Sequence, residues 1–514
     1  MSRARRIIGG LGLGYVNLIV AVVAGIWLTR FFIARLGEHR YGLWLIGTQF
    51  VGYALLLDLG IVQLLPRQVA FATGRSGGWQ ESRDLPVLVG ETARLVLFQA
   101  PVLAALALAG LVLVPAEWEE LRGPLSIVAA ALVLAFPLRI PQAVLAGLQD
   151  LGFLGRLQLA TWLLSTSVTV AGVTMGLGLY AFALGYVAAQ LLPIVSCLAR
   201  LRWRYPGVLP ARLARLGRGR AGEMMRSGAW ASVGQVSHIL LTGTDLLVIG
   251  AVFGPAAVVM YSCTSKVLSV TANLPQMILP VAGPALSELR TSASKERLFR
   301  AAQAVGQLIV VVSGGIAVVV LGTNEAFVRW WVGPSQYGGT VMTVLLTTQL
   351  VIRHWNLSVS MTLFSIGRER RTGTTSLVDG AVTVLGLVVF SRALGPQFAP
   401  LGPIAGALLV TLPSNLLALR EEGWSPRGYV LGFRSWAWRL VALGAAAIAA
   451  AGVLRGAGLP RLALGGAVAG AVYLAFMWPV LVGPPLGDYS RPRIAQALAF
   501  ARAGARRGGS GAKT

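Results

Sequence analysis

Charged and reactive side chains are scarce in this sequence. Of its 514 residues only 12% are charged, three are histidine and two, Cys197 and Cys263, are cysteine. So few cysteines exclude a disulfide framework and a cysteine-rich metal site. The sequence also lacks a GxxxxGK(S/T) phosphate-binding loop and an HExxH pair. We therefore expect no ATP-driven pump, no resident metal and no cofactor.

Acidic residues are fewer than basic ones, 19 against 44, which gives a formal net charge of +25. In a soluble protein this excess would indicate nucleic acid as a partner. Here the basic residues gather in alternate loops between apolar stretches, with eight arginines from Arg200 to Arg226, while an opposite loop carries Glu117, Glu119 and Glu120. Cytoplasmic loops of membrane proteins carry an excess of Lys and Arg. The pattern predicts both termini in the cytoplasm and no nucleic-acid partner.

Apolar residues dominate the chain, at 55% of the composition and a mean hydropathy of +0.71. Fourteen separate stretches are long enough to cross a bilayer, which takes roughly 20 apolar residues in a helix. The sequence therefore predicts an all-α polytopic membrane protein with about 14 transmembrane helices. The stretches are 11–33, 41–66, 87–114, 124–148, 153–176, 179–199, 228–250, 256–282, 301–322, 339–365, 373–394, 401–419, 436–454 and 461–483.

The longest and most basic internal loop divides the first twelve stretches into two sets of six. An even number in each set gives both halves the same orientation, as in parallel repeats related by an axis along the membrane normal. The last two stretches have no counterpart and are expected to form an added helical hairpin. The predicted organisation is an N-terminal lobe at 1–199, a basic cytoplasmic linker at 200–226, a C-terminal lobe at 227–420, the hairpin at 421–485 and a basic cytoplasmic tail at 486–514.

A short internal sequence repeat supports the two-lobe arrangement. Leu36-Gly37 is followed by an aromatic residue, Trp44, seven positions after the glycine, and Phe253-Gly254 is followed by Tyr261 at the same spacing. We expect each glycine to lie in the turn between the first and second helix of its lobe.

Several motifs carry a resemblance to a known family. Leu36–Trp44 reads LGEHRYGLW, Leu57–Ile61 reads LDLGI around Asp58, Thr244–Gly250 reads TDLLVIG and Leu363–Arg368 reads LFSIGR. Together with Arg67 and the layout of the whole chain, these segments resemble polysaccharide-biosynthesis flippases. Such flippases are the Wzx-type members of the multidrug/oligosaccharidyl-lipid/polysaccharide exporter superfamily.

The resemblance implies a transporter rather than an enzyme. It implies two six-helix lobes around a central cavity that opens alternately to the two sides of the bacterial cytoplasmic membrane. The implied cargo is an undecaprenyl-pyrophosphate-linked oligosaccharide, moved from the inner to the outer leaflet. The partners expected on this basis are membrane lipid, the glycan-bearing lipid, and polymerase or export proteins.

Five basic residues lie inside predicted spans: Arg30, Arg94, Arg139, Lys266 and Arg353. A charged side chain at the bilayer centre costs about 2.5–3.5 kcal/mol on insertion scales, so each is a candidate functional residue. Guanidinium groups offer a planar fork of donors that matches phosphate oxygens. We therefore predict that these five residues bind the pyrophosphate of the cargo. Arg353 is the strongest candidate, and Arg353→Ala is expected to abolish transport while membrane insertion stays normal.

Structural roles compete with this prediction for several of the five. Arg30 can reach the lipid head groups from the end of its span. Arg94 follows Glu91 by one helical turn, which suits an intrahelical ion pair. Arg139 lies between Pro137 and Pro141, where a broken helix would expose carbonyl groups as hydrogen-bond acceptors.

Three acidic residues in predicted spans, Glu91, Asp245 and Asp379, are candidates for ion coupling, because a buried carboxylate can change its protonation with access to water. Asp245 and Asp379 could equally be counter-charges for Lys266 or Arg353, and the sequence leaves both readings open. His238 beside Gln235 could carry protons or serve as a hydrogen-bonded structural residue.

Two other functions fit parts of the sequence. A multidrug antiporter of the same superfamily would move organic cations, although the excess of basic residues in the spans favours an anionic cargo. A membrane glycosyltransferase or polymerase would need acidic residues on a sizeable external loop, and the largest such loop, 322–339, carries only Glu325.

Overall fold

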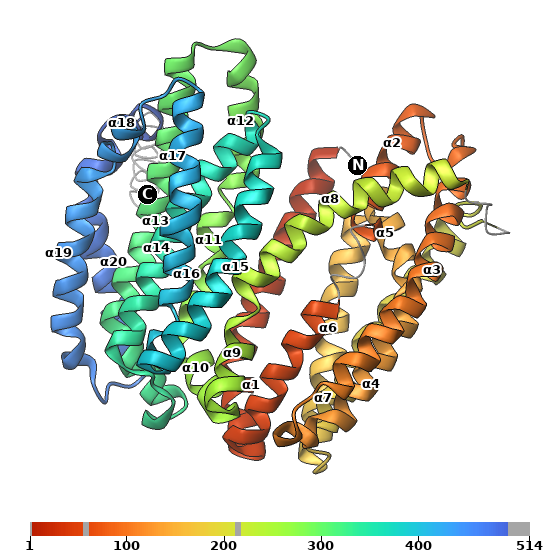
Figure 1. Ribbon diagram of the computed structural model, residues 1–514, viewed down its shortest axis with the longest axis horizontal. Coiled ribbons are helices and arrows are strands. Elements are labelled where there is room, and N and C mark those ends of the chain that lie inside the picture. The colour runs from red at the N-terminus through yellow and green to blue at the C-terminus, as the bar shows by residue number, and fades with distance from the viewer. Residues whose placement is uncertain (1–2, 55–60, 211–216, 492–514) are drawn as a thin grey trace, which may run out of the picture. The chain divides into compact units, whose positions relative to one another are not determined.

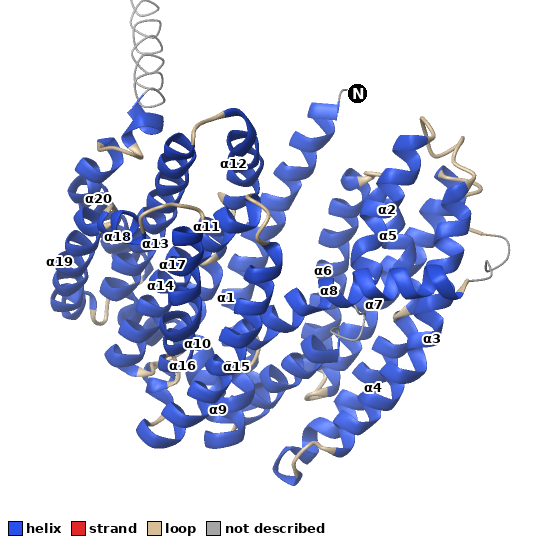
Figure 2. Ribbon diagram, turned by 45° about the horizontal axis from the view of Figure 1, so that its top comes forward, coloured by secondary structure: helices blue, strands red, loops and turns tan. Residues whose placement is uncertain are grey.

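A computed structural model describes residues 3–54, 61–210 and 217–491 of the chain, and each regular element in these ranges is a helix (Figure 2). The predicted all-α class is therefore confirmed. Asp58 lies outside the described residues. The chain forms two compact units, unit 1 at Met1–Val259 and unit 2 at Met260–Thr514, which are described separately below.

Unit 1 is built from nine α-helices and the beginning of a tenth among its described residues (Figure 1). They are α1 (Arg3–Ala54), α2 (Ile61–Arg75), α3 (Asp84–Val112), α4 (Glu119–Ala135), α5 (Ile140–Gly147), α6 (Leu151–Thr174), α7 (Tyr180–Arg204), α8 (Arg218–Thr242), α9 (Asp245–Phe253) and the start of α10 (Pro255–Thr271). The helix α1 is interrupted at Gly37, whose backbone is not helical.

Two spans of unit 1 are broken rather than straight. The path from α4 to α5 bends by 57° at a 3-10 turn, η3 (Pro137–Arg139). Proline lacks a backbone N–H and its ring clashes with the preceding turn, so Pro137 and Pro141 explain this break. The path from α8 to α9 bends by 44° around Gly243 and Thr244. Each break redirects the chain, so the side chains that follow it point in directions that a straight helix would not give them.

Small residues bring the helices of unit 1 close together. A Cβ atom added to Gly172 of α6 would lie 2.7 Å from the Cβ of Ala181 on α7, and Gly185 of α7 leaves no room for a side chain beside Thr169. Gly147 of α5 meets Val69 of α2 in the same way, at 2.6 Å. Helices in membranes associate through such close packing because apolar surface alone gives no preference over lipid.

The remaining helices form unit 2. They are the rest of α10, α11 (Asn273–Gln276), α12 (Leu279–Ser292), α13 (Lys295–Trp331), α14 (Gly339–Ser365), α15 (Glu369–Leu394), α16 (Leu401–Gly406), a π-helical turn η6 (Ala407–Thr411), α17 (Leu412–Glu421), α18 (Pro426–Leu431), α19 (Arg434–Ala450) and α20 (Leu459–Val482).

The helix α13 forms the centre of unit 2 and supports the hairpin of α19 and α20. Its buried face packs against both hairpin helices (Figure 1). The hydroxyl of Tyr473 on α20 donates to the carbonyl of Val311 on α13 at 2.7 Å. The same hydroxyl lies directly beside Gly314 of α13. At one end of the hairpin, Arg455 pairs with the buried Glu325 of α13 at 3.0 Å. The hairpin is thus attached by packing and polar contacts along α13.

Eight helices of the described chain are long and apolar enough to cross a membrane, or up to ten if each bent pair counts as one span. The chain is therefore a multi-pass membrane protein. The predicted number of 14 spans and the predicted lobe boundaries stay predictions. The helices α8 and α9, which the sequence assigned to the C-terminal lobe, belong to the first compact unit by their contacts.

The two glycines of the internal sequence repeat adopt matching backbone conformations. Gly37 has φ 79° and ψ 165°, and Gly254 has φ 83° and ψ 172°. Each ends one helix and begins the next, so the predicted turns are confirmed. This region of backbone conformation is essentially restricted to glycine. Within unit 1, Gly42 packs directly on Pro255, and a Cβ added to Gly250 would lie 2.5 Å from the Ile46 side chain. The two turns therefore pack against each other.

Candidate functional site

A polar cavity of about 740 Å³ opens within unit 1. Its walls come from α1, α2, η3, α5, α6 and α8, so segments up to 187 residues apart in sequence (52 to 239) contribute to it. The described residues that line it are Gly52, Val62, Gln63, Arg139, Gln142, Ala143, Ala146, Leu154, Gly234, Gln235, His238 and Ile239. Seven of these twelve residues are small or aliphatic, and the other five are polar or basic.

Arg139 supplies a full positive charge to the cavity. The break between α4 and α5 at Pro137 places Arg139 in the short turn from which its side chain lines the cavity. Its guanidinium makes no ion pair with a carboxylate and no hydrogen bond to a carbonyl group within the described chain. The helix break expected from the two prolines is confirmed, whereas the expected bond from Arg139 to a freed carbonyl is not found there.

Four further polar side chains line the same cavity: Gln63 on α2, Gln142 on α5, and Gln235 with His238 on α8. Gln142 follows Arg139 by three residues and His238 follows Gln235 by three, a spacing that places each pair on one helical face. Side-chain hydrogen bonds to other described residues are absent for all four. Each of the four lines the cavity, where a polar occupant could meet its donors and acceptors.

The lining residues that the structure describes include no aspartate and no glutamate. The guanidinium of Arg139, the imidazole of His238 and three amides are groups suited to an anionic or neutral polar ligand. Arginine is suited to this task because its planar fork can hold two phosphate or carboxylate oxygens at once.

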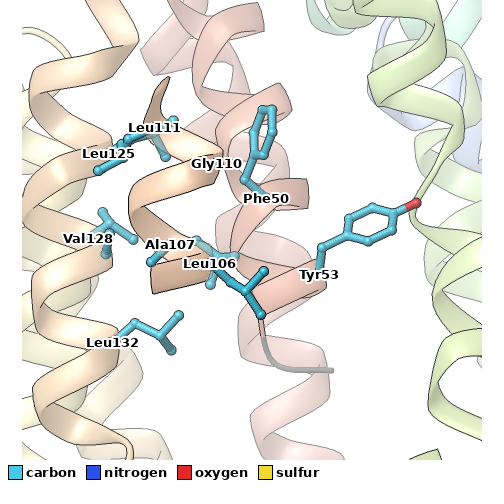
Figure 3. A pocket seen from close by; sticks show the side chains of 11 residues that line it. Phe50, Tyr53, Leu106, Ala107, Gly110, Leu111, Leu125, Val128 and Leu132 are labelled. Atoms are coloured by element: carbon cyan, nitrogen blue, oxygen red, sulfur yellow. The ribbon is translucent and has the colours of Figure 1, made fainter. Parts of the chain in front are cut away.

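An apolar pocket of about 320 Å³ lies across α1 from this polar cavity. It is formed by α1, α3 and α4, and Figure 3 shows Phe50, Leu106, Leu125, Val128 and Leu132 around it. Gly52 lines the polar cavity, whereas its neighbours in sequence line the apolar pocket. The ring of Tyr53 points toward α9, where its hydroxyl lies 2.5 Å from that of Thr244. This end of α1 therefore has one polar and one apolar side.

Arg353 and Asp379 meet in the interior of unit 2. The guanidinium of Arg353 on α14 donates to both carboxylate oxygens of Asp379 on α15, each at 3.1 Å. It also donates to the hydroxyl of Thr383 at 2.8 Å and to the carbonyl of Pro403 at 2.9 Å. Asp379, which is 2% exposed, accepts a further hydrogen bond from Thr411 of the π-helical turn. Of the two roles left open for Asp379, the structure shows the counter-charge for Arg353.

The other predicted basic residues do not line the polar cavity. Arg30 is exposed on α1, and Arg94 is half-buried on α3. Lys266 is half-buried on α10 within unit 2. A pyrophosphate-binding role for these three residues stays a prediction.

The remaining acidic candidates have distinct surroundings. Glu91 is buried on α3, one turn before Arg94. Asp245 begins α9, and its carboxylate accepts a hydrogen bond from the backbone N–H of Leu246 at 2.9 Å. Their part in ion coupling also stays a prediction.

His354, beside Arg353, is buried and its Nδ1 lies 2.8 Å from the Ser313 hydroxyl.

Sequence reasoning missed Gln63 and Gln142 as site residues. Gln63 lies in the predicted span 41–66 and Gln142 in the predicted span 124–148, and both spans are largely apolar. A search limited to ionisable side chains passes over neutral amides, although the spacing of Gln142 from Arg139 indicated a shared face.

Comparison with solved structures shows the fold. The lipid II flippase MurJ in an inward closed conformation aligns with a TM-score of 0.65 and 10% identity, over 93% of this chain and 100% of that chain. An inward-facing multidrug resistance MATE family transporter of the MOP superfamily aligns at 0.60 and 13%, over 80% and 97%. A variant of the Vibrio cholerae MATE transporter VcmN aligns at 0.54 and 14%, over 81% and 98%. The chain therefore shares the fold of these three transporters.

Residues 97–342 match the model of a family described as polysaccharide biosynthesis protein. No curated protein matches the chain. The family match over these residues agrees with the predicted resemblance to polysaccharide-biosynthesis proteins, and the solved structures agree with it in fold.

Proposed function

We propose that this protein is a flippase that moves an undecaprenyl-pyrophosphate-linked oligosaccharide from the inner to the outer leaflet of the bacterial cytoplasmic membrane. The polar cavity of unit 1 carries the proposal, because Arg139 lines it and its described wall holds no carboxylate. In this proposal the cavity opens alternately to the two sides of the membrane, and both termini lie in the cytoplasm. The protein is a transporter and catalyses no covalent step.

The charged head group is the main physical obstacle to such transport. A pyrophosphate that leaves water needs fixed donors in its place, whereas a polyprenyl tail can stay in the hydrocarbon of the bilayer. Arg139 can provide a paired, charge-assisted contact to phosphate oxygens, and the His238 ring can add an N–H donor. The apolar pocket around Phe50 gives the opposite side of α1 a surface suited to hydrocarbon.

The predicted basic residues take different parts in this proposal. Arg139 is the principal contact for the pyrophosphate, and Arg30, Arg94 and Lys266 are further cations on the route. Arg353 acts as a structural residue, since Asp379, Thr383 and Pro403 already engage its guanidinium.

Reconstitution in proteoliposomes tests the function. The measurement follows the leaflet exposure of a labelled polyprenyl-pyrophosphate oligosaccharide, with an organic cation dye as a second cargo. We expect protein-dependent movement of the glycolipid without movement of the dye. Arg139→Ala should lose this transport and Arg139→Lys should keep part of it, because lysine retains the charge without the planar fork. Arg392→Ala, at an exposed arginine of α15, is the matched control and should transport normally.

The multidrug antiporter makes the opposite prediction. Exchange of the dye under an imposed ion gradient, without movement of the glycolipid, would overturn the flippase proposal. Normal glycolipid transport by Arg139→Ala would leave the function standing and remove the proposed contact.

A further inference from the structure

Three glutamines line the polar cavity of unit 1. Gln63, Gln142 and Gln235 come from three different helices, α2, α5 and α8. All three are at least partly exposed to the cavity, and none bonds to another described residue through its side chain. Gln307 of unit 2, by contrast, bonds across its helix bundle to the carbonyl of Gly432 at 3.0 Å.

The chemistry of an amide differs from that of a guanidinium. A glutamine side chain offers two N–H donors and a carbonyl acceptor and carries no charge. A phosphate oxygen accepts hydrogen bonds but donates none, so it would leave three carbonyl acceptors without a partner. Sugar hydroxyl groups both donate and accept, and therefore match every part of an amide.

We infer that Gln63, Gln142 and Gln235 bind hydroxyl groups of the sugar next to the pyrophosphate. Arg139 takes the phosphate side of the same junction. The inference rests on the proposed function and deepens it: unit 1 recognises a sugar diphosphate, and prenyl pyrophosphate without a sugar is a poorer ligand. A site built to hydrogen-bond hydroxyl groups rejects a ligand that lacks them, because its polar groups are then left unpaired.

Equilibrium binding to the full-length protein in nanodiscs tests this inference. The probes are a short-chain prenyl pyrophosphate that carries a disaccharide and the same prenyl pyrophosphate without sugar. We expect the wild-type protein to bind the glycosylated probe about tenfold or more tightly, as several hydrogen bonds of ordinary strength would give. The triple variant Gln63→Leu, Gln142→Leu and Gln235→Leu keeps side-chain size and removes the amides.

The triple variant should lose the preference for the glycosylated probe and keep its affinity for prenyl pyrophosphate, which also shows that it is folded. Arg139→Ala should weaken binding of both probes. Gln397→Leu, outside the cavity in unit 2, should keep the preference.

Each other outcome counts against one of the two claims. Equal affinity of the wild-type protein for the two probes, or a preference that survives in the triple variant, would overturn the role of the glutamines while leaving the flippase proposal intact. Failure of the wild-type protein to bind either probe would count against the proposed function itself, and the inference would fall with it. If the triple variant bound neither probe, the three single Gln→Leu variants would decide, and loss of prenyl pyrophosphate binding in each would overturn the assignment to sugar.

Discussion

Arg353 and Asp379 form a two-pronged ion pair that joins α14 to α15 inside unit 2, with both N–O distances at 3.1 Å. Thr383, Pro403 and Thr411 complete the network and connect it to α16 and the π-helical turn. A guanidinium held by this many acceptors fixes helices to one another. The pair therefore changes the expectation for Arg353→Ala from loss of transport alone to loss of stability.

The first prediction concerns single replacements in this pair. Arg353→Ala leaves the Asp379 carboxylate buried without its counter-charge, which typically destabilises a protein by roughly 3–5 kcal/mol. We expect a lower thermal unfolding temperature for Arg353→Ala in detergent. The double variant Arg353→Met with Asp379→Leu should recover much of the loss, since no uncompensated charge remains. Arg392→Ala is the control, and an unchanged unfolding temperature in Arg353→Ala would contradict the structural role.

The second prediction is chemical rescue of the Arg353→Ala variant. Removal of the side chain leaves the acceptors at Asp379, Thr383 and Pro403 around a space shaped for a guanidinium. Millimolar guanidinium ion should therefore raise the unfolding temperature of this variant, whereas sodium chloride at the same ionic strength should do so less. The same guanidinium concentration should not stabilise the Arg353→Ala, Asp379→Asn double variant. Equal responses to both salts would argue against a specific site.

The third prediction concerns the two turns of the internal sequence repeat. Gly37 and Gly254 adopt positive φ with extended ψ. This region of backbone conformation costs other residues of order 1–3 kcal/mol. Gly37→Ala and Gly254→Ala should each lower the unfolding temperature by a similar amount, because both turns share one conformation. Gly25→Ala is the matched control, since Gly25 is helical in the same α1 and has open space around it. A loss in the control as large as at Gly37 would show that backbone conformation is not the cause.

The fourth prediction tests the attachment of the hairpin to α13. A Cβ added to Gly314 would lie 2.5 Å from the hydroxyl oxygen of Tyr473, and the hydrogen bond to Val311 holds that hydroxyl in place. Overpacking of this kind costs about 1–3 kcal/mol. Gly314→Ala should therefore destabilise the protein and increase proteolysis in the connection before α20. Gly466→Ala on α20 is the control, because its nearest neighbour would lie at an ordinary contact distance of 3.7 Å.

The helical architecture was predictable because its signals are local. Stretches of roughly 20 apolar residues must satisfy their backbone hydrogen bonds internally, so the lipid environment dictates helices wherever they occur. Pro137 and Pro141 marked the break before α5, and the spacing after Gly37 and Gly254 marked two equivalent turns. Each of these inferences depends on a few adjacent residues and the backbone conformations they allow.

The partners of the charged residues were decided by tertiary structure. Arg139 and Arg353 look alike in the sequence, each an arginine within an apolar stretch. Packing gives Arg353 a carboxylate 26 residues away, whereas Arg139 lines a cavity with side chains from α2, α5 and α8. The chemistry of a buried charge is set by the groups within a few ångströms of it, and helices that are distant in sequence supply those groups.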